Sequence, residues 1–413
     1  MAQVKPFKCI RPDARLAHRV AALPYDVYNR QEAKKEVERE PLSFLRIDRA
    51  ETSFDDSVDT YDPVVYRKAN ELLQQMIDDG TFIEDNDECY YIYELVMGGR
   101  SQIGLVACAS IDDYLNNVIK KHENTREDKE IDRIKHVDAC NANTGPIFLT
   151  YRANRLINDA TAEAMKGAPI YSFRSPDGIR HIVWRIDRKD IIQEIKKAFE
   201  DIDSIYIADG HHRAASAVKV GLMRRKDNPG YSGSEEFNYF LAVLFPHDQL
   251  LIMPYNRVVK DLNGLTEEEF LREIEKSFDV TLNGCQPYAP DRKACFGMYL
   301  GDKWYRLEAK ASIIDDRDPV ALLDVSILQN NLLGPVLGIL DPRTDKRIDF
   351  IGGIRGLAEL ERRVNQDMKV AFSMYPTSIE ELFAVSDAGL LMPPKSTWFE
   401  PKLRSGLFIH KLS

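Results

Sequence analysis

The sequence predicts an α+β protein whose sheets are mixed or largely antiparallel. Helix-like segments and short β-rich segments alternate along the 413 residues. Several pairs of β-rich segments are separated only by glycine-containing turns, as in β-hairpins. Hydrophobic residues make up 44% of the chain and charged residues 30%, an ordinary composition for a globular protein. Because a chain of this length exceeds one typical core, we expect more than one domain.

In the first half of the chain, segments with apolar residues at helical spacing predict helices, several of them ended by proline or glycine. These helices cover residues 30–40, 64–79, 111–121, 154–166 and 191–199. Short runs of β-branched and aromatic residues between turn signals predict strands. These strands cover residues 43–47, 89–96, 101–109, 146–151, 169–173 and 179–186.

The second half continues the same alternation. Predicted strands cover residues 237–245, 249–253, 294–300, 303–307, 348–351 and 369–375, the first two of them as a hairpin. Predicted helices cover residues 267–278, 324–333, 356–363 and 378–388. We place a domain boundary near residue 255. It separates a core domain or domains, 1–255, from a C-terminal α+β domain, 256–413, which carries a docked C-terminal loop.

The segment 204–217, near the midpoint, organises the rest of the chain. It begins with three strand formers, passes through an Asp-Gly turn and continues into an alanine-rich helix. This order places His211, His212 and Arg213 at a helix N-terminus, where free N–H donors and a partial positive charge suit an anion. Arg213 adds a fork of donors for phosphate oxygens. The residues expected to bind phosphate or nucleotide here are Asp209, Gly210, His212 and Arg213. The alternative is a solvated helix start in which one histidine caps or packs.

A second cluster lies in the most charged part of the chain, residues 120–136. His122, Glu123 and Thr125 bring a histidine, a carboxylate and a hydroxyl together. A carboxylate near a phosphate site can act as a general base or hold magnesium. We therefore predict catalytic roles for His122 and Glu123, although a solvated charged helix would show the same spacing.

A third cluster lies near the C-terminus, where two prolines precede Lys395, Ser396 and Thr397. A lysine and two hydroxyls can meet an anion. Trp398 and Phe399 follow directly, and such aromatic residues can anchor a loop on a core or stack on a base. We predict that the three polar residues contribute to phosphate or nucleotide binding.

Several function classes are disfavoured by the sequence. The net charge of −10 makes nucleic-acid binding unlikely, since this needs a basic face. The six cysteines form no C-x-x-C pair, and the spread is typical of reduced intracellular thiols. No run is long and apolar enough for a bilayer, and the first ten residues lack the apolar region of a signal peptide, so we expect a cytoplasmic protein. Walker and Rossmann fingerprints are also absent, and no metal ligands can be assigned.

Four motifs along the chain resemble those of the DUF1015 family. They are Pro24-Tyr25-Asp26-Val27, His122-Glu123-x-Thr125, Ala208-Asp209-Gly210-His211-His212-Arg213 and Pro394-Lys395-Ser396-Thr397-x-Phe399. The Asp209–Arg213 turn also resembles the phosphate-binding turn of the ParB/sulfiredoxin superfamily, which includes free-serine kinases. This resemblance implies a ParB/sulfiredoxin-like core around the turn.

The resemblance further implies a phosphoryl-transfer enzyme that acts on serine or phosphoserine, in the manner of a kinase or of a phosphatase. Its partners would be a small phosphorylated metabolite or a nucleotide such as ADP or ATP, with Mg²⁺. Glu123 would activate the attacking hydroxyl or water, and His211 or His212 would act as the acid. The alternatives are a nucleotide-binding regulator of the ParB type, which has no turnover, and a purely structural protein.

Overall fold

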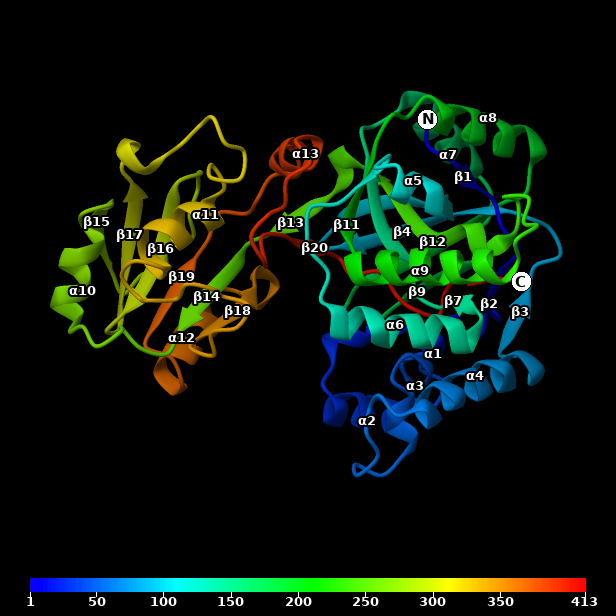
Figure 1. Cartoon of the computed structure of the whole chain (residues 1–413), viewed down its shortest axis with the longest axis horizontal. Helices are drawn as coiled ribbons and strands as arrows, with labels where there is room; N and C mark the ends of the chain where they lie inside the picture. The colour runs from blue at the N-terminus through cyan, green and yellow to red at the C-terminus, as the bar shows by residue number, and fades with distance from the viewer. The chain divides into compact units, whose positions relative to one another are not determined.

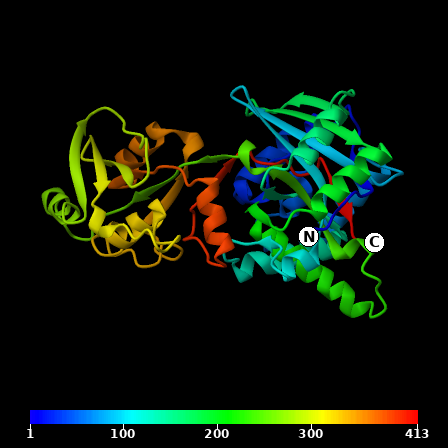
Figure 2. The same ribbon diagram turned by 90° about the horizontal axis from the view of Figure 1, so that it is seen from above.

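The computed structural model describes all residues 1–413. They form two compact units: residues 1–250 with 401–413, and residues 251–400. Both chain ends lie in the first unit (Figure 2). The sequence analysis assigns residues 256–413 to one C-terminal domain, whereas in the structure the last thirteen residues belong to the first unit. They do so because β21 (Ile409–Lys411) pairs with β2 (Cys9–Pro12) and β7 (Ala142–Asn143).

The first unit is built on a nine-stranded mixed sheet. In spatial order the strands are β6 (Ile119–Lys120), β11 (Ile205–Asp209), β8 (Ile147–Tyr151), β12 (Tyr239–Pro246), β5 (Arg100–Ser110), β4 (Tyr90–Met97), β10 (Arg180–Ile186) and β9 (Tyr171–Arg174), with β1 (Val4–Lys5) on β5. Two pairs are parallel, β11 with β6 and β12 with β8, and the others are antiparallel. A four-stranded sheet runs β3 (Phe82–Glu84), β2, β21, β7.

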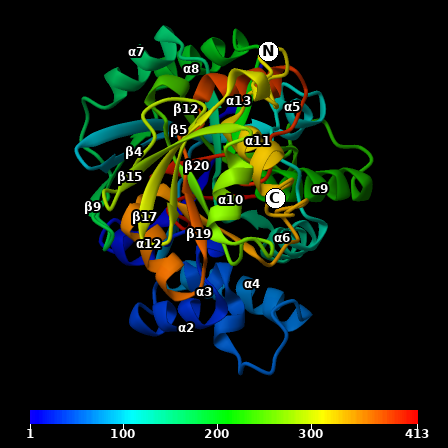
Figure 3. The same cartoon turned by 90° about the vertical axis from the view of Figure 1, so that its left-hand side faces the viewer.

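Helices pack around these sheets (Figure 1). They are α1 (Ala17–Val20), α2 (Arg30–Arg39), α3 (Leu45–Asp48), α4 (Pro63–Asp78), α5 (Ile111–Leu115), α6 (Glu127–Cys140), α7 (Arg155–Ala164), α8 (Lys189–Glu200) and α9 (His211–Asp227). Short 3₁₀ turns are η1 (Tyr25–Val27), η2 (Ala50–Ser53), η3 (Glu236–Asn238) and η4 (His247–Gln249). Helices α6 and α9 lie side by side, and α4 packs on α6 (Figures 1 and 3).

The main core holds the start of α9 against the sheet. Ile205 and Ile207 of β11 share one apolar cluster with Ala214 and Val218 of α9 and with Phe199 of α8. Each large side chain of this kind contributes about 1.5–3 kcal/mol when it is fully buried. The end of β11 and the beginning of α9 are therefore fixed by packing on both sides of the turn between them.

The second unit is an antiparallel six-stranded sheet with helices. Its strands, in spatial order, are β15 (Phe278–Gly284), β17 (Lys303–Ala309), β16 (Cys295–Leu300), β19 (Val370–Ser373), β14 (Tyr255–Val259) and β18 (Ile348–Gly352). A two-stranded sheet joins β13 (Leu251–Met253) to β20 (Trp398–Glu400). The helical segments are α10 (Glu267–Ile274), η5 (Ala311–Ile313), α11 (Asp324–Leu328), the π-helix η6 (Gln329–Leu333), η7 (Gly353–Arg355), α12 (Leu357–Gln366) and α13 (Ile379–Asp387). The predicted α+β class with mixed and antiparallel sheets is confirmed.

Three local predictions were wrong. Within the strand predicted over residues 43–47, residues 45–47 belong to α3, because a short run whose apolar side chains Phe44, Leu45 and Ile47 are all buried has no period that separates a strand from a helix. Residues 249–253 do not form a hairpin with β12, since β13 pairs with β20. The helix predicted over 111–121 ends at Leu115, and β6 follows it.

We predict that Gly221 of α9 is required for close packing. A Cβ at this position would lie 2.5 Å from the Phe237 carbonyl oxygen and 2.8 Å from Ile111 Cδ1. Gly221→Ala should lower the free energy of unfolding by about 1–3 kcal/mol, despite the helix propensity of alanine. The matched control is Gly230→Ala, where a Cβ meets nothing within 4 Å. Urea unfolding measures both, and equal stability of the two variants would contradict the packing argument.

Candidate functional site

The turn between β11 and α9 adopts the predicted strand–turn–helix form. The register of β11 against β8 shifts between Ile207 and Asp209, an irregularity of the kind that re-aims side chains at the end of a strand. Gly210 then takes a φ of +94°, which a residue with a Cβ rarely adopts. The first helical hydrogen bond runs from Ala214 N–H to the Gly210 carbonyl, and no side chain caps the helix. The N–H groups of residues 211–213 are therefore not used within the helix.

Arg213 folds back over this turn. A Cβ on Gly210 would lie 3.0 Å from its Nε and Nη2 atoms. Its Nη1 donates to the Pro146 carbonyl, and a Cβ on Gly145 would lie 3.8 Å from the same nitrogen. Arg213 forms no ion pair with a carboxylate within 4 Å. Its charge therefore remains available to an anion at the start of α9.

Asp209 is held as a carboxylate by cations. Lys402 Nζ lies 3.1 Å from Asp209 Oδ2. Burial raises the pKa of Asp209, but the charges of Lys402 and Arg213 outweigh it and hold this pKa below its ordinary value. Lys402 was not predicted as a site residue. The signal that could have found it is its position shortly after the C-terminal motif, seven residues after Lys395.

His122, Glu123 and His211 lie together beside the turn. The His122 and His211 rings pack edge to face with centroids 4.4 Å apart. The backbone N–H of His122 donates to His211 Nε2 at 3.5 Å. This bond leaves the His211 proton on Nδ1, which lies 3.8 Å from Glu123 Oε2. The sequence predicted each of these residues, and the structure brings them to one end of α9.

Both buried rings are neutral near pH 7. Burial and the neighbouring His122 ring lower the pKa of His211 well below its ordinary value. Burial lowers the pKa of His122 to about 4, although the charge of Asp209 opposes this shift. Neither ring nitrogen of His122 makes a hydrogen bond. A neutral histidine suits hydrogen bonding or proton acceptance better than the acid role expected from the sequence.

His212 contacts the backbone just before α6. Its Nε2 accepts a hydrogen bond from Arg126 N–H at 2.9 Å. Burial lowers the pKa of its ring, so the neutral form that accepts this bond is favoured. His212 therefore fixes the backbone just before α6 and helps to hold residues 122–126 against α9.

The predicted C-terminal residues belong to the second unit. Lys395 has a φ of +59°, its Nζ lies 5.6 Å from the centroid of the Tyr255 ring, and its carbonyl accepts from Arg257 Nη2 at 3.0 Å. Ser396 Oγ donates to the Pro393 carbonyl, and the Ser396 carbonyl accepts from Thr377. These contacts order the loop. A role for Lys395, Ser396 and Thr397 in phosphate binding stays a prediction.

None of the thirteen helices combines the length and the apolar character that a bilayer-spanning segment needs.

Comparisons with other proteins give one family and several distant structures. The chain matches the family model described as "Protein of unknown function (DUF1015)" over residues 4–326. No curated protein matches its sequence. A mutant free serine kinase in complex with AMP is 14% identical, with 73% of this chain and 91% of that chain covered and a TM-score of 0.37. SbnI with a C-terminal truncation, from Staphylococcus aureus, is 12% identical, with 74% and 87% covered and a TM-score of 0.39. A conserved hypothetical protein from Pyrococcus furiosus is 13% identical, with 74% and 95% covered and a TM-score of 0.35.

We predict that His122 makes the protein sensitive to acid. The unfolded chain binds a proton below about pH 6.5, whereas the buried ring binds one only near pH 4, so stability is lost as the pH falls through this window. Between pH 7 and pH 5, His122→Leu should lose about 2 kcal/mol less unfolding free energy than the wild type.

Urea unfolding at the two pH values measures this difference. The matched control is His18→Leu, because the His18 side chain is exposed and lies on α1, outside this cluster. Equal acid sensitivity of His122→Leu and the wild type would show that burial does not lower the pKa of the His122 ring in the folded protein.

Proposed function

The chain belongs to the DUF1015 family, and we propose that it is a phosphoryl-transfer enzyme that acts on serine or phosphoserine, with a nucleotide as the other phosphoryl partner. One observation carries the proposal: the uncapped start of α9 presents unused N–H groups next to Arg213, which has no carboxylate partner. The choice of serine follows the resemblance of the Asp209–Arg213 turn to that of free-serine kinases.

An anion is the ligand that these groups accommodate best. Hydrogen bonds to a charged partner each stabilise by about 1.5–3 kcal/mol, and the helix terminus adds a favourable field for negative charge. Lys402, held by Asp209, adds a second cation beside the turn. The paired carboxylate keeps the net charge of the site from becoming strongly positive before the anion binds.

The phosphoryl group moves between two oxygen atoms. In the kinase direction, the serine hydroxyl oxygen bonds to the terminal phosphorus of ATP, the bond from this phosphorus to the bridging oxygen breaks, and ADP leaves. Glu123 accepts the hydroxyl proton, and the Nδ1–H of His211 orients the Glu123 carboxylate. Arg213 and the N–H groups of α9 stabilise the charge on the phosphoryl oxygens. In the phosphatase direction, a water oxygen bonds to the phosphorus of phosphoserine and gives a proton to Glu123. The bond from this phosphorus to the serine oxygen breaks, the serine oxygen takes up that proton, and serine and inorganic phosphate leave.

Magnesium would have to take most of its ligands from the nucleotide. No group of three His, Cys, Asp or Glu side chains converges as a metal site. Mg²⁺ commonly binds through one or two carboxylates together with phosphate oxygens and water. Asp209 is the carboxylate beside the turn, and an ion bound there would displace Lys402 from it. Bound Mg²⁺ would offset the negative charge of the phosphates.

We predict that purified protein converts serine and ATP to phosphoserine and ADP, or catalyses the reverse reaction or phosphoserine hydrolysis. Phosphorus NMR of mixtures with and without ADP, ATP and Mg²⁺ follows all three reactions. Arg213→Ala should lower the rate about 100-fold or more, as the loss of one charge-stabilising donor typically does. The matched control, Arg155→Ala, removes an arginine whose side chain is 91% exposed and should keep full activity.

Calorimetry with ADP and ATP separates this enzyme from the alternative, a nucleotide-binding regulator without turnover. Nucleotide binding without any product would favour the regulator. Absence of both binding and product would overturn the proposal that the start of α9 is a phosphate site.

A further inference from the structure

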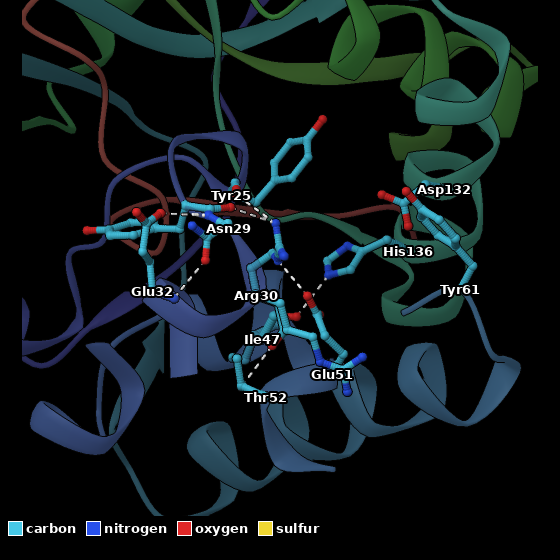
Figure 4. Close-up of polar contacts among 12 residues, drawn as sticks. Tyr25, Asn29, Arg30, Glu32, Ile47, Glu51, Thr52, Tyr61, Asp132 and His136 are labelled. Carbon is cyan, nitrogen blue, oxygen red and sulfur yellow. Dashed lines mark hydrogen bonds and ion pairs between the residues drawn. The ribbon is translucent and has the colours of Figure 1, made fainter. Parts of the chain in front are cut away.

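A polar cavity of about 150 Å³ lies under α6 in the first unit. We call it the α6 cavity. It is lined by η1, α3, η2, the beginning of α4 and α6, including Tyr25, Asp48, Glu51, Arg133 and His136. Figure 4 shows Tyr25, Glu51 and His136, which come from three separate elements, η1, η2 and α6. Since drug-sized ligands occupy about 300–1,000 Å³, this volume suits a metabolite of few heavy atoms and not a nucleotide.

Two buried carboxylates in the cavity wall each have one unused oxygen. Glu51 is 2% exposed, and its Oε1 accepts from Arg49 Nε at 2.6 Å. Asp48 is 5% exposed, and its Oδ1 accepts from Thr144 Oγ1 at 3.2 Å. Glu51 Oε2 and Asp48 Oδ2 accept no hydrogen bond within the protein. Because neither oxygen has a donor within the protein, a cationic donor such as an ammonium group would be stabilised beside them.

The same wall also has unused positive charge. Arg133 is 7% exposed and uses Nε and Nη2 on Asp132, at 2.9 and 2.8 Å. Its guanidinium lies 4.0 Å from the centroid of the Tyr25 ring, and Nη1 has no partner within the protein. Lys129 also lines the cavity, at 3.4 Å from the hydroxyl of Tyr61. These donors suit a carboxylate.

The α6 cavity adjoins the turn between β11 and α9. A smaller cavity of about 30 Å³, the turn cavity, is lined by Arg213 and Gly145. The two cavities share Tyr25, Asp48, Arg133 and His136. His136 Nε2–H donates to the Ile47 carbonyl at 3.1 Å, so the neutral ring keeps a lone pair on Nδ1. The His136 ring, which lines both cavities, therefore keeps one hydrogen-bond acceptor.

We propose that the α6 cavity binds the zwitterionic head of a small hydroxy amino acid or of its phosphate ester. Asp48 and Glu51 hold the ammonium group, Arg133 and Lys129 hold the carboxylate, and the hydroxyl or phosphate extends through the shared wall to Arg213. This inference rests on the proposed phosphoryl transfer and identifies where its small substrate binds. It also explains why so many charged side chains surround a cavity instead of a filled core.

Calorimetry of the full chain with single compounds tests the cavity without any nucleotide. L-serine is the probe, and its two truncated analogues are ethanolamine, which lacks the carboxylate, and lactate, which lacks the ammonium group. We expect L-serine to bind at least ten-fold more tightly than either analogue. Binding of L-serine no tighter than that of ethanolamine or lactate would overturn the proposal.

Two variants locate the binding. Glu51→Gln should lower the affinity for L-serine at least ten-fold. The matched control Glu71→Gln, on the exposed face of α4, should leave this affinity unchanged. Because Glu51 also holds Arg49, a second variant at the cavity rim, Lys129→Ala, guards against misfolding. Lys129→Ala should lower the affinity for L-serine several-fold and leave the affinity for ethanolamine unchanged. Unchanged L-serine affinity in both variants would place the ligand elsewhere.

The outcomes for the cavity and for the enzyme are separable. Selective L-serine binding without phosphoryl transfer would support the α6 cavity and contradict the enzyme. Phosphoryl transfer to serine in Glu51→Gln and Lys129→Ala with wild-type Michaelis constants would support the enzyme and contradict the cavity.

Discussion

The left-handed backbone of Gly210 is the constraint on which the site depends. With a φ of +94° this residue ends β11 and begins α9 without supplying a side-chain cap, so the first N–H groups of a long helix stay unused. The absence of a Cβ also leaves room for the Arg213 guanidinium, which lies about 3 Å from where that atom would be. The apolar cluster behind the turn fixes both flanking elements. One glycine thus allows an uncapped helix start and an unpaired cation at the same place, an arrangement that favours an anion.

Around this turn, burial and neighbouring charges together decide the protonation of His122, His211 and Asp209. His122 and His211 are kept neutral, Asp209 is kept charged by its cations, and Glu123 faces the single proton of His211. The adjoining α6 cavity differs, since Glu51, Asp48 and Arg133 each pair with a neighbouring residue and keep one polar atom without a partner in the protein. A phosphate site and a zwitterion site that share a wall would bring a small substrate to the phosphoryl group without a large pocket.

The sequence predicted what is local and missed what is assembled over long distances. The β11–turn–α9 unit was predictable because strand formers, an Asp-Gly turn and an alanine-rich helix follow one another within fourteen residues. The edge-to-face contact of His122 and His211 joins residues 89 apart, and the ion pair of Lys402 with Asp209 joins residues 193 apart. No spacing rule reaches so far, which is why Lys402 was missed. The α6 cavity was missed for the same reason. The short apolar run at 43–47 was mistaken for a strand because such runs carry no period of their own, and tertiary packing made it a helix.

A crystal structure of the complex with ADP tests the central claim most directly. The account predicts phosphate oxygens within hydrogen-bonding distance of the N–H groups of residues 211–213 and of the Arg213 guanidinium. Phosphates bound away from the start of α9, with Arg213 still donating only to the Pro146 carbonyl, would contradict it.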